Sequence, residues 1–537
     1  MLPAIPAAAA LAGLIFLFAR RFSKAKWVAL TWALVSLPTL AVLTYHWWDH
    51  HVGPDPYARW QFYLSPVNMS LVLPLAVISP LLLWAAEGRG LGMKRDSVVS
   101  ALSCFALSAA LGALLCRHFF LLTCLFTLAT LFIAGAALMR EKGKRSFAAA
   151  VLFPLGLSDL CLALGILFLY LSDPSRGLFF PNAPLELSGN LIAACALMFA
   201  AALLRLGCFP FHGWMVRICE GGKDFRLIHL LAVDLILGTF LLYSVTRVFF
   251  VWEGVWIWIC FGLSALTLVL ALRGLLSAAR RYEVWGLLCV ALGAQIALAA
   301  SPGSQMAAAA MRLGLWAGIP ALALIHIGSV KGRRRTWALV LGAASLMGIP
   351  AMAGFTWRWM EFQVLAGELS GGASVLYVAA MVLVFAGALI EGFTSLWIPR
   401  VEEEEASGTA TIAAGALLAA FLLAIGLYAG AVVDLLMREY GLAVSLPFSS
   451  WTSLGWAVLL CAGTATLILY AWSYRGRGEG WRETAFPGGA LPLWSGGRIA
   501  PGILKVPGSG KGLAAIILGD VLLYAAWAAV IVYLAFT

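Results

Sequence analysis

The stretch RLGCFPFHGW, residues 205–214, interrupts a long apolar run and places a charged residue directly before a helix breaker. Pro210 has no backbone N–H, so it removes a donor that a continuing helix would need. Arg205 lies five residues before this proline, and His212 lies two residues after it. We therefore expect a broken helix here, with a charge at the break.

A second interruption is LMGIPAMAGF, residues 346–355, where Gly348, Pro350 and Gly354 fall inside another apolar run. Arg358 follows this second stretch, whereas Arg205 lies at the start of the first stretch. Broken helices in two corresponding places are typical of an ion path in a transporter built from repeats. Two ordinary proline kinks are the plainer alternative.

The composition places the whole chain in a membrane. Of its 537 residues, 62% are apolar and 11% are charged, with a mean hydropathy of +0.94. A soluble domain is about 45–50% apolar and about 25% charged, so soluble, disordered and disulfide-rich secreted classes are excluded. The ten cysteines are scattered singly, and there is no P-loop, dinucleotide fingerprint or haem-type histidine pair. We expect no metal, no cofactor and no catalytic centre within this chain.

We count sixteen apolar runs long enough to cross a bilayer, which needs about 20 residues each. The net charge of +11 comes from short basic clusters that fall in alternate loops, which places both ends outside and excludes a nucleic-acid surface. The first run then serves as an uncleaved anchor. The expected spans are 3–19, 27–46, 66–86, 98–116, 119–138, 147–171, 190–207, 226–248, 254–272, 284–301, 306–329, 337–356, 373–397, 409–433, 452–473 and 514–536.

Ionisable residues inside these spans are the main candidates for function, because each costs a few kcal/mol unless it is paired or hydrated. Pairing of Arg205 with Asp159 would lower the cost of both. As an alternative to a functional role, Arg358 and Glu391 could lie near a helix end, with their charges reaching the membrane interface. His326 could instead be a hydrogen-bonded histidine of the core. The full set is Asp159, Arg205, His229, Asp234, Arg312, His326, Arg358, Glu391 and Asp520.

The two interrupted stretches resemble parts of a known family. Residues 205–214, followed by Ile228-His229, are similar to the seventh and eighth helices of the antiporter-like subunits of respiratory complex I. Mrp-type sodium/proton antiporters and membrane-bound hydrogenases have related subunits. Residues 348–355 resemble the twelfth-helix motif of that family, and the region around Asp159 resembles its sixth helix. Residues 60–80 are similar to the approach to its third helix.

The resemblance implies an all-α integral membrane protein with two inverted five-helix repeats, each with one broken helix. The repeats would span 98–250, with the break near 205–214, and 251–397, with the break near 346–356. Flanking helices would occupy 1–97 and 398–537. The implied role is movement of protons or sodium within a larger assembly of membrane and redox subunits, related to an NADH:quinone oxidoreductase or a hydrogenase. Such assemblies lie in an energy-transducing membrane, such as a bacterial or archaeal plasma membrane.

The chain also departs from this family. The family has lysine where this sequence has Arg205, and arginine keeps its proton at any accessible pH. The acidic partner expected on the fifth helix is missing from 119–138, and the histidine–lysine pair expected on the eleventh helix is absent. At the second interruption, the nearest charge, Arg358, is expected to lie past the end of the helix.

Three functions remain open. The chain conducts ions through a rebuilt relay, or it is a non-pumping scaffold subunit, or it is a separate transporter of a small solute. Histidine suits a relay because it accepts and releases protons near neutral pH. The first reading needs a buried hydrophilic corridor between the two breaks. Its expected members are Asp159, Arg205, His212, His229, Asp234, His326 and Arg358.

Overall fold

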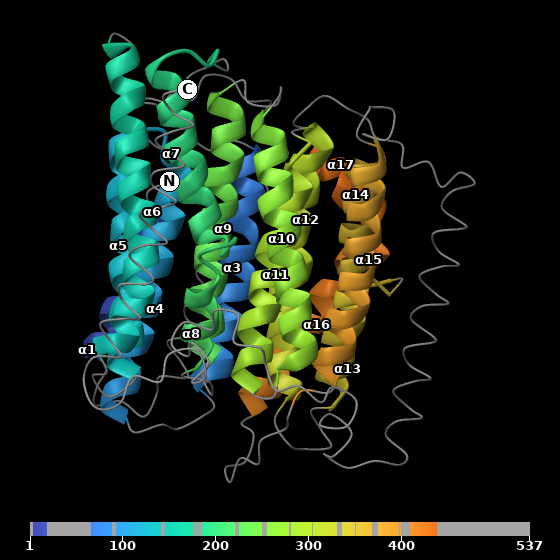
Figure 1. Ribbon diagram of the computed structural model, residues 1–537. Helices are drawn as coiled ribbons and strands as arrows, with labels where there is room; N and C mark the ends of the chain where they lie inside the picture. The colour runs from blue at the N-terminus through green and yellow to red at the C-terminus, as the bar shows by residue number, and fades with distance from the viewer. Residues whose placement is uncertain are drawn as a thin grey trace, which may run out of the picture.

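The computed structural model describes residues 4–18 and most of 66–437, and it forms a bundle of helices (Figure 1). Within these residues the regular elements are all helical, apart from isolated bridge residues such as Leu185, which pairs with Phe249. The prediction of an all-α membrane protein is confirmed at this level. Outside the description lie 1–3, 19–65, 88–92, 141–144, 175–179, 181–184, 221–224, 250–254, 279–280, 303, 330–335, 350, 368–373, 397, 399–408 and 438–537.

Most of the helices stand roughly parallel in the bundle (Figure 1). Their bounds are α1 (Ala4–Phe18), α3 (Pro66–Glu87), α4 (Met93–Leu115), α5 (Phe119–Arg140), α6 (Arg145–Ser172), α7 (Asn190–Arg205), α8 (Gly213–Glu220), α9 (Phe225–Val248), α10 (Val255–Ser277), α11 (Arg281–Ala300), α12 (Gln305–Gly328), α13 (Thr336–Leu346), α14 (Ala353–Gly367), α15 (Ser374–Leu396), α16 (Thr409–Leu427) and α17 (Ala429–Met437).

Eight of the described helices are long and apolar enough to cross a membrane, or nine if the bent pair α16 and α17 counts as one span. Four shorter apolar helices accompany them in the same part of the chain. The predicted spans 27–46, 452–473 and 514–536 lie outside the described residues. The total of sixteen spans and the boundaries of the two repeats therefore stay predictions.

Both predicted interruptions are present, and glycine ends the first half-helix in each. At the end of α7, Gly207 takes a positive φ of 66°. Its N–H donates to Leu204 O over 3.2 Å, and Cys208 N–H donates to Leu203 O over 2.9 Å. This is the Schellman pattern, which satisfies the last carbonyls of a helix. The helix therefore ends before Pro210 is reached, so the proline follows the break and does not cause it.

The second break repeats this arrangement. At the end of α13, Gly348 has a φ of 74° and donates its N–H to Ser345 O over 3.0 Å. Ile349 N–H donates to Ala344 O over 3.0 Å. Only a residue without a Cβ adopts this conformation at little cost. Pro350, which we expected to mark this break, lies outside the described residues.

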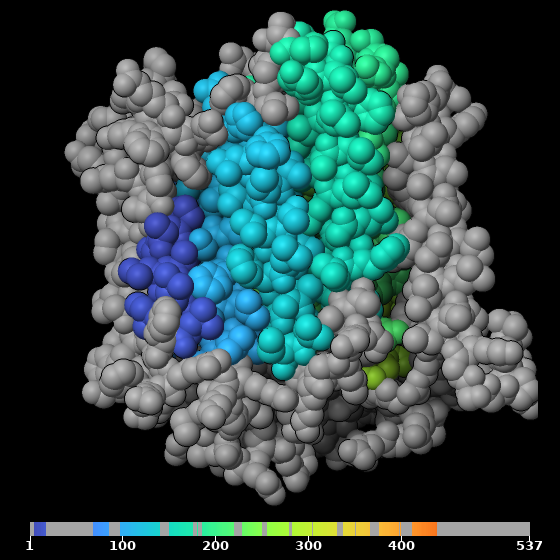
Figure 2. Space-filling model, turned by 90° about the vertical axis from the view of Figure 1, so that its left-hand side faces the viewer, coloured from blue at the N-terminus to red at the C-terminus, as the bar shows by residue number. Residues whose placement is uncertain are grey.

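The core of the bundle lies around α12, whose apolar stretch is wholly buried, while α9 and α11 are almost as enclosed. The outer helices expose apolar side chains instead, including Phe120 and Leu131 of α5 and Leu160 and Leu167 of α6. Figure 2 shows one such face, with α1 in dark blue beside the cyan and green helices. A surface this apolar is stable in contact with lipid or with other membrane subunits.

Candidate functional site

The first break carries a buried charge cluster. Arg205, the last residue of α7, is 0% exposed. Its guanidinium forms ion pairs with Asp159 of α6, over 2.5 Å, and with Asp234 of α9. It also donates to the hydroxyl of Thr130 of α5 over 2.8 Å. These four residues, from four helices, are the first cluster.

The guanidinium is enclosed on its remaining sides. It lies 4.7 Å from the centre of the Phe126 ring, and it approaches the carbonyl oxygen of the same residue at 3.4 Å. A methyl group at Gly238 of α9 would stand 3.0 Å from the Cβ of Arg205, so α9 packs closely here. The Oδ2 atoms of Asp159 and Asp234 have no hydrogen-bond partner among the described residues. The pairing of Arg205 with Asp159 that we expected is therefore present, with a second acid added.

The second break carries a matching cluster. Arg358 of α14 forms ion pairs with Glu361, over 3.3 Å, and with Glu391 of α15, over 2.8 Å. Gln295 of α11 donates its amide N–H to the other oxygen of Glu391 over 2.7 Å. These four residues are the second cluster. All are at least 95% buried, with exposed fractions of 5% for Arg358, 0% for Glu361, 2% for Glu391 and 0% for Gln295.

Polar atoms without a partner occur on residues of the second cluster and on others near the second break. Within the described part of the chain, the amide oxygen of Gln295, the hydroxyls of Ser345 and Thr356, the Trp357 Nε1 and one oxygen of Glu361 accept or donate no hydrogen bond. All of these atoms are buried. Buried polar atoms that lack a protein partner are the usual binding places of internal water. The second break is therefore the more polar of the two.

These contacts correct two expectations. Arg358 does not lie past the helix end, because α14 continues to Gly367 and places it in the second turn. Arg358 and Glu391 do not reach the interface either, since both are buried and paired with each other. Glu361 was missed, although its spacing of three residues from Arg358 puts both on one helix face. Gln295 and Thr130 were also missed, and no sequence signal distinguishes them from other polar residues in apolar helices.

The three histidines lie apart from the arginines. His212 stacks against Phe209, with ring centres 6.2 Å apart, and is 8% exposed. His229 is 0% exposed, and neither ring nitrogen has a hydrogen-bond partner among the described residues. His326 packs edge-on against Trp285 at 4.8 Å. Among the described residues, none of these histidines is an ion-pair partner of Arg205 or Arg358, and the expected relay through them stays a prediction.

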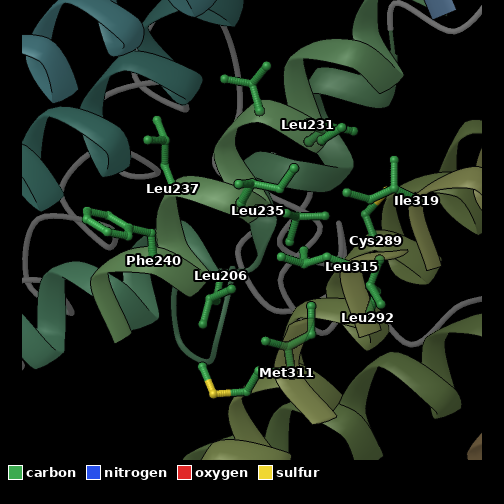
Figure 3. Close-up of a cluster of buried hydrophobic side chains, with 14 of the residues drawn as sticks. Leu206, Leu231, Leu235, Leu237, Phe240, Cys289, Leu292, Met311, Leu315 and Ile319 are labelled. Atoms are coloured by element: carbon green, nitrogen blue, oxygen red, sulfur yellow. The ribbon is translucent and has the colours of Figure 1, made fainter. Parts of the chain in front are cut away.

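Apolar side chains fill the space where α9, α11 and α12 meet (Figure 3). Leu206, Leu235, Leu292, Leu315 and Ile319 belong to this group and are each at most 2% exposed. We call the labelled side chains of Figure 3 the apolar barrier; they are Leu206, Leu231, Leu235, Leu237, Phe240, Cys289, Leu292, Met311, Leu315 and Ile319. These helices therefore contribute apolar side chains where they meet, and the hydrophilic corridor between the breaks stays a prediction.

A third buried arginine has a different environment. Arg312 of α12 is 2% exposed and donates to Ser70 Oγ of α3 and to Leu436 O of α17, both over 3.1 Å. It also donates to Ala308 O of its own helix over 2.9 Å. A cation is stabilised at the carboxyl end of a helix, where α17 ends. Arg312 therefore ties α12 to α3 and α17.

No group of three or more histidine, cysteine or acidic side chains in the described residues has the geometry of a metal site. No family model matches the sequence, and no curated protein matches it either.

Several solved membrane complexes contain chains of this fold. A chain of the Mrp complex from Dietzia sp. DQ12-45-1b matches with a TM-score of 0.70 and 14% identity, over 98% of this chain and 60% of that one. A chain of the membrane-bound sulfane sulfur reductase, an archaeal respiratory membrane complex, gives 0.67 and 16%, over 89% and 85%. A chain of respiratory complex I from Thermus thermophilus gives 0.61 and 19%, over 81% and 99%. The protein has the fold of these chains at low identity, so the resemblance is confirmed for the fold.

Proposed function

We propose that this chain is an antiporter-like membrane subunit of a multi-subunit assembly and that it moves protons through its two charge clusters. The observation that supports the proposal is the same at both helix breaks. In each, a buried arginine is held between two buried carboxylates from neighbouring turns or helices. Buried ionisable groups in a membrane span are costly and are retained mainly where they serve transport.

The carboxylates are the proton carriers in this scheme. A guanidinium does not release its proton in a protein, so Arg205 acts as a fixed charge that changes partners. When Asp234 takes up a proton, its ion pair weakens and the arginine binds Asp159 more strongly. When Asp159 takes up the proton, the preference reverses. Arg358 acts in the same way between Glu361 and Glu391.

Protons fit this geometry better than sodium does. In each cluster the guanidinium occupies the position between the two carboxylates, which a metal cation would need for its own coordination. A proton requires no such space, because it binds a single carboxylate oxygen. The oxygens of Asp159, Asp234 and Glu361 that lack a hydrogen-bond partner among the described residues are available for this.

We infer that other membrane subunits bind the apolar outer helices and that redox subunits of the assembly supply the energy. The support is the fold shared with chains of a respiratory complex I, an archaeal respiratory complex and an Mrp complex. An energy-transducing membrane, such as a bacterial or archaeal plasma membrane, is the location that suits this role.

A second candidate is a non-pumping scaffold subunit of the same kind of assembly. The apolar barrier favours it, because apolar side chains fill the place where α9, α11 and α12 meet (Figure 3). The two candidates differ in one measurable property, which is passive or driven proton flux through the chain.

Proton uptake by vesicles tests the proposal. The full chain, with the subunits that accompany it in mild detergent, is reconstituted into phosphatidylcholine and phosphatidylglycerol vesicles that contain a pH-sensitive dye. A potassium gradient with valinomycin then imposes a potential. We expect uptake by the wild type and its loss in Asp159→Asn and Asp234→Asn. The control is Asp434→Asn, an exposed acid of α17. Uptake that is unchanged in both cluster variants would favour the scaffold.

A further inference from the structure

The charges of the two clusters do not balance. Each contains two carboxylates and one guanidinium, which leaves one excess negative charge when all groups are ionised. In the described part of the chain, no other charged side chain forms an ion pair with Arg205, Asp159 or Asp234. The same holds for Arg358, Glu361 and Glu391. A net charge on groups as deeply buried as these is strongly unfavourable.

The backbone makes the imbalance larger. Arg205 lies at the carboxyl end of α7, where the helix dipole adds negative charge. Arg358 directs one N–H toward Leu346 O, at the carboxyl end of α13, over 3.4 Å. Both guanidinium groups therefore share their positive charge with carbonyl oxygens as well as carboxylates. A proton on one carboxylate of each cluster restores neutrality without any movement of the helices.

Helix α11 packs closely against the end of α7 and against α12. A methyl group added at Gly293 of α11 would overlap Leu206 O and stand 3.4 Å from a methyl group of Leu235 of α9. One added at Gly318 of α12 would overlap Leu292 of α11. At these two points there is no space for a water molecule with its hydrogen-bond partners. Proton transfer across these helices would need such water, because their facing side chains are apolar (Figure 3).

We propose that each helix break stores one exchangeable proton on its carboxylate pair, and that the apolar barrier keeps the two protons from exchanging with each other. The chain then contains two separate proton sites where the expected corridor would contain one shared path. The role of these protons in transport rests on the proposed function. Their presence on the carboxylates does not, because it can be measured in a chain that transports nothing.

Infrared spectroscopy counts these protons through the C=O stretch of protonated carboxylic acids, which shifts in D2O. Difference spectra are taken near neutral pH between the wild-type chain, purified with its accompanying subunits, and single variants. Asp159→Asn and Asp234→Asn should each remove the same acid band, since one aspartate then balances Arg205. Glu361→Gln should remove a different band. Glu186→Gln, at an exposed position, serves as the control and should change neither band.

The outcomes are distinct. Difference spectra without acid bands would mean that all four carboxylates are ionised, which overturns the proposal. A variant in one cluster that removes or shifts both bands would overturn the separation of the sites. Bands that behave as expected in a chain that takes up no protons in vesicles would contradict the proposed function and leave the stored protons in place.

A substitution in the barrier tests its role independently. Leu292→Asn places a polar side chain between α11 and α12, whereas Leu292→Met keeps the position apolar and similar in volume. We expect the methionine variant to take up protons in vesicles at the wild-type rate and the asparagine variant to do so at least several-fold faster. Equal rates from two folded variants would show that the barrier does not control exchange.

Discussion

The two helix breaks reach the same arrangement of charges from different positions in the chain. Arg205 is the last residue before the first break, whereas Arg358 lies in the second turn after the other. Each break ends its first half-helix with a glycine at positive φ, and each arginine meets two acids. The comparison teaches that the caps fix where the helices stop, while the position of the charge is free to vary.

The clusters differ most in their neutral partners. Thr130 accepts from Arg205 in the first cluster, so it supports the cation. Gln295 donates to Glu391 in the second, so it supports an anion. The second cluster also has more unpartnered polar atoms around it. We therefore expect the first cluster to depend more strongly on its arginine.

Removal of the arginines should have the largest effect and should separate the two clusters. Arg205→Leu leaves two buried aspartates without their cation, and loss of one partner of a buried pair costs about 3–5 kcal/mol. Arg358→Leu should cost less, because Gln295 still donates to Glu391. Chemical unfolding in detergent micelles measures both values. Arg205→Lys and Arg358→Lys, which keep the charge, should retain most of the stability. Equal losses in the two leucine variants would contradict the difference between the clusters.

Glycines that bring backbones together should give the next largest effect. A methyl group at Gly354, at the start of α14, would overlap the carbonyl oxygen of Ser345, and one at Gly293 would overlap that of Leu206. Neither carbonyl can move unless the end of its helix moves too. Each alanine variant should therefore lose about 3 kcal/mol of unfolding free energy, which is the upper end of the range for overpacked cores. Gly262→Ala in α10 is the matched control, since nothing lies within 4 Å of the added group. If thermal unfolding shows the same loss of stability for Gly262→Ala as for Gly354→Ala and Gly293→Ala, the backbones do not approach each other closely at the latter two glycines.

The neutral partners should matter less. Thr130→Val and Gln295→Leu each remove one hydrogen bond to a charged group, which costs about 1.5 kcal/mol or somewhat more. In the infrared experiment they should act oppositely. Without Thr130, Arg205 binds its aspartates more closely, whereas without Gln295, Glu391 loses a donor and holds a proton more readily. Identical spectra for the two variants would show that the neutral partners are equivalent.

The aromatic contacts should give the smallest effect. Phe126→Leu removes the ring 4.7 Å from the first guanidinium, and a desolvated cation–π contact contributes about 1 kcal/mol. The ring of Trp357 lies 4.0 Å from the second guanidinium, so Trp357→Phe keeps part of that contact. Unfolding experiments on both variants should show the larger loss for Phe126→Leu after correction for the volume removed. A larger loss for Trp357→Phe would reverse this order.

The sequence predicts the breaks and the membrane class because glycines and apolar runs act locally. The predicted spans 98–116 and 119–138 meet at the connection between α4 and α5, and the spans 284–301 and 306–329 meet at the connection between α11 and α12. Partner choice is not local in this way. Asp234 was a candidate, but nothing in the sequence shows that α9 brings it to Arg205. Glu361 was missed because the helix was ended too early, before the turn that contains it.

The apolar barrier could not be predicted for a related reason. Leu235, Leu292 and Leu315 belong to different helices, and leucine in a membrane span faces lipid as readily as it faces another helix. Only the packing of α9, α11 and α12 shows that these side chains meet. The expected corridor followed from the charges alone, which say where polar groups occur and not what lies between them.

Electron cryo-microscopy of the chain in its assembly, at a resolution that shows ordered water, tests the central claim most directly. The account predicts Arg205 between Asp159 and Asp234, and Arg358 between Glu361 and Glu391. It also predicts no water among the side chains of the apolar barrier. A continuous file of water molecules from Asp234 to Glu391, or either arginine turned away from both of its acids, would contradict it.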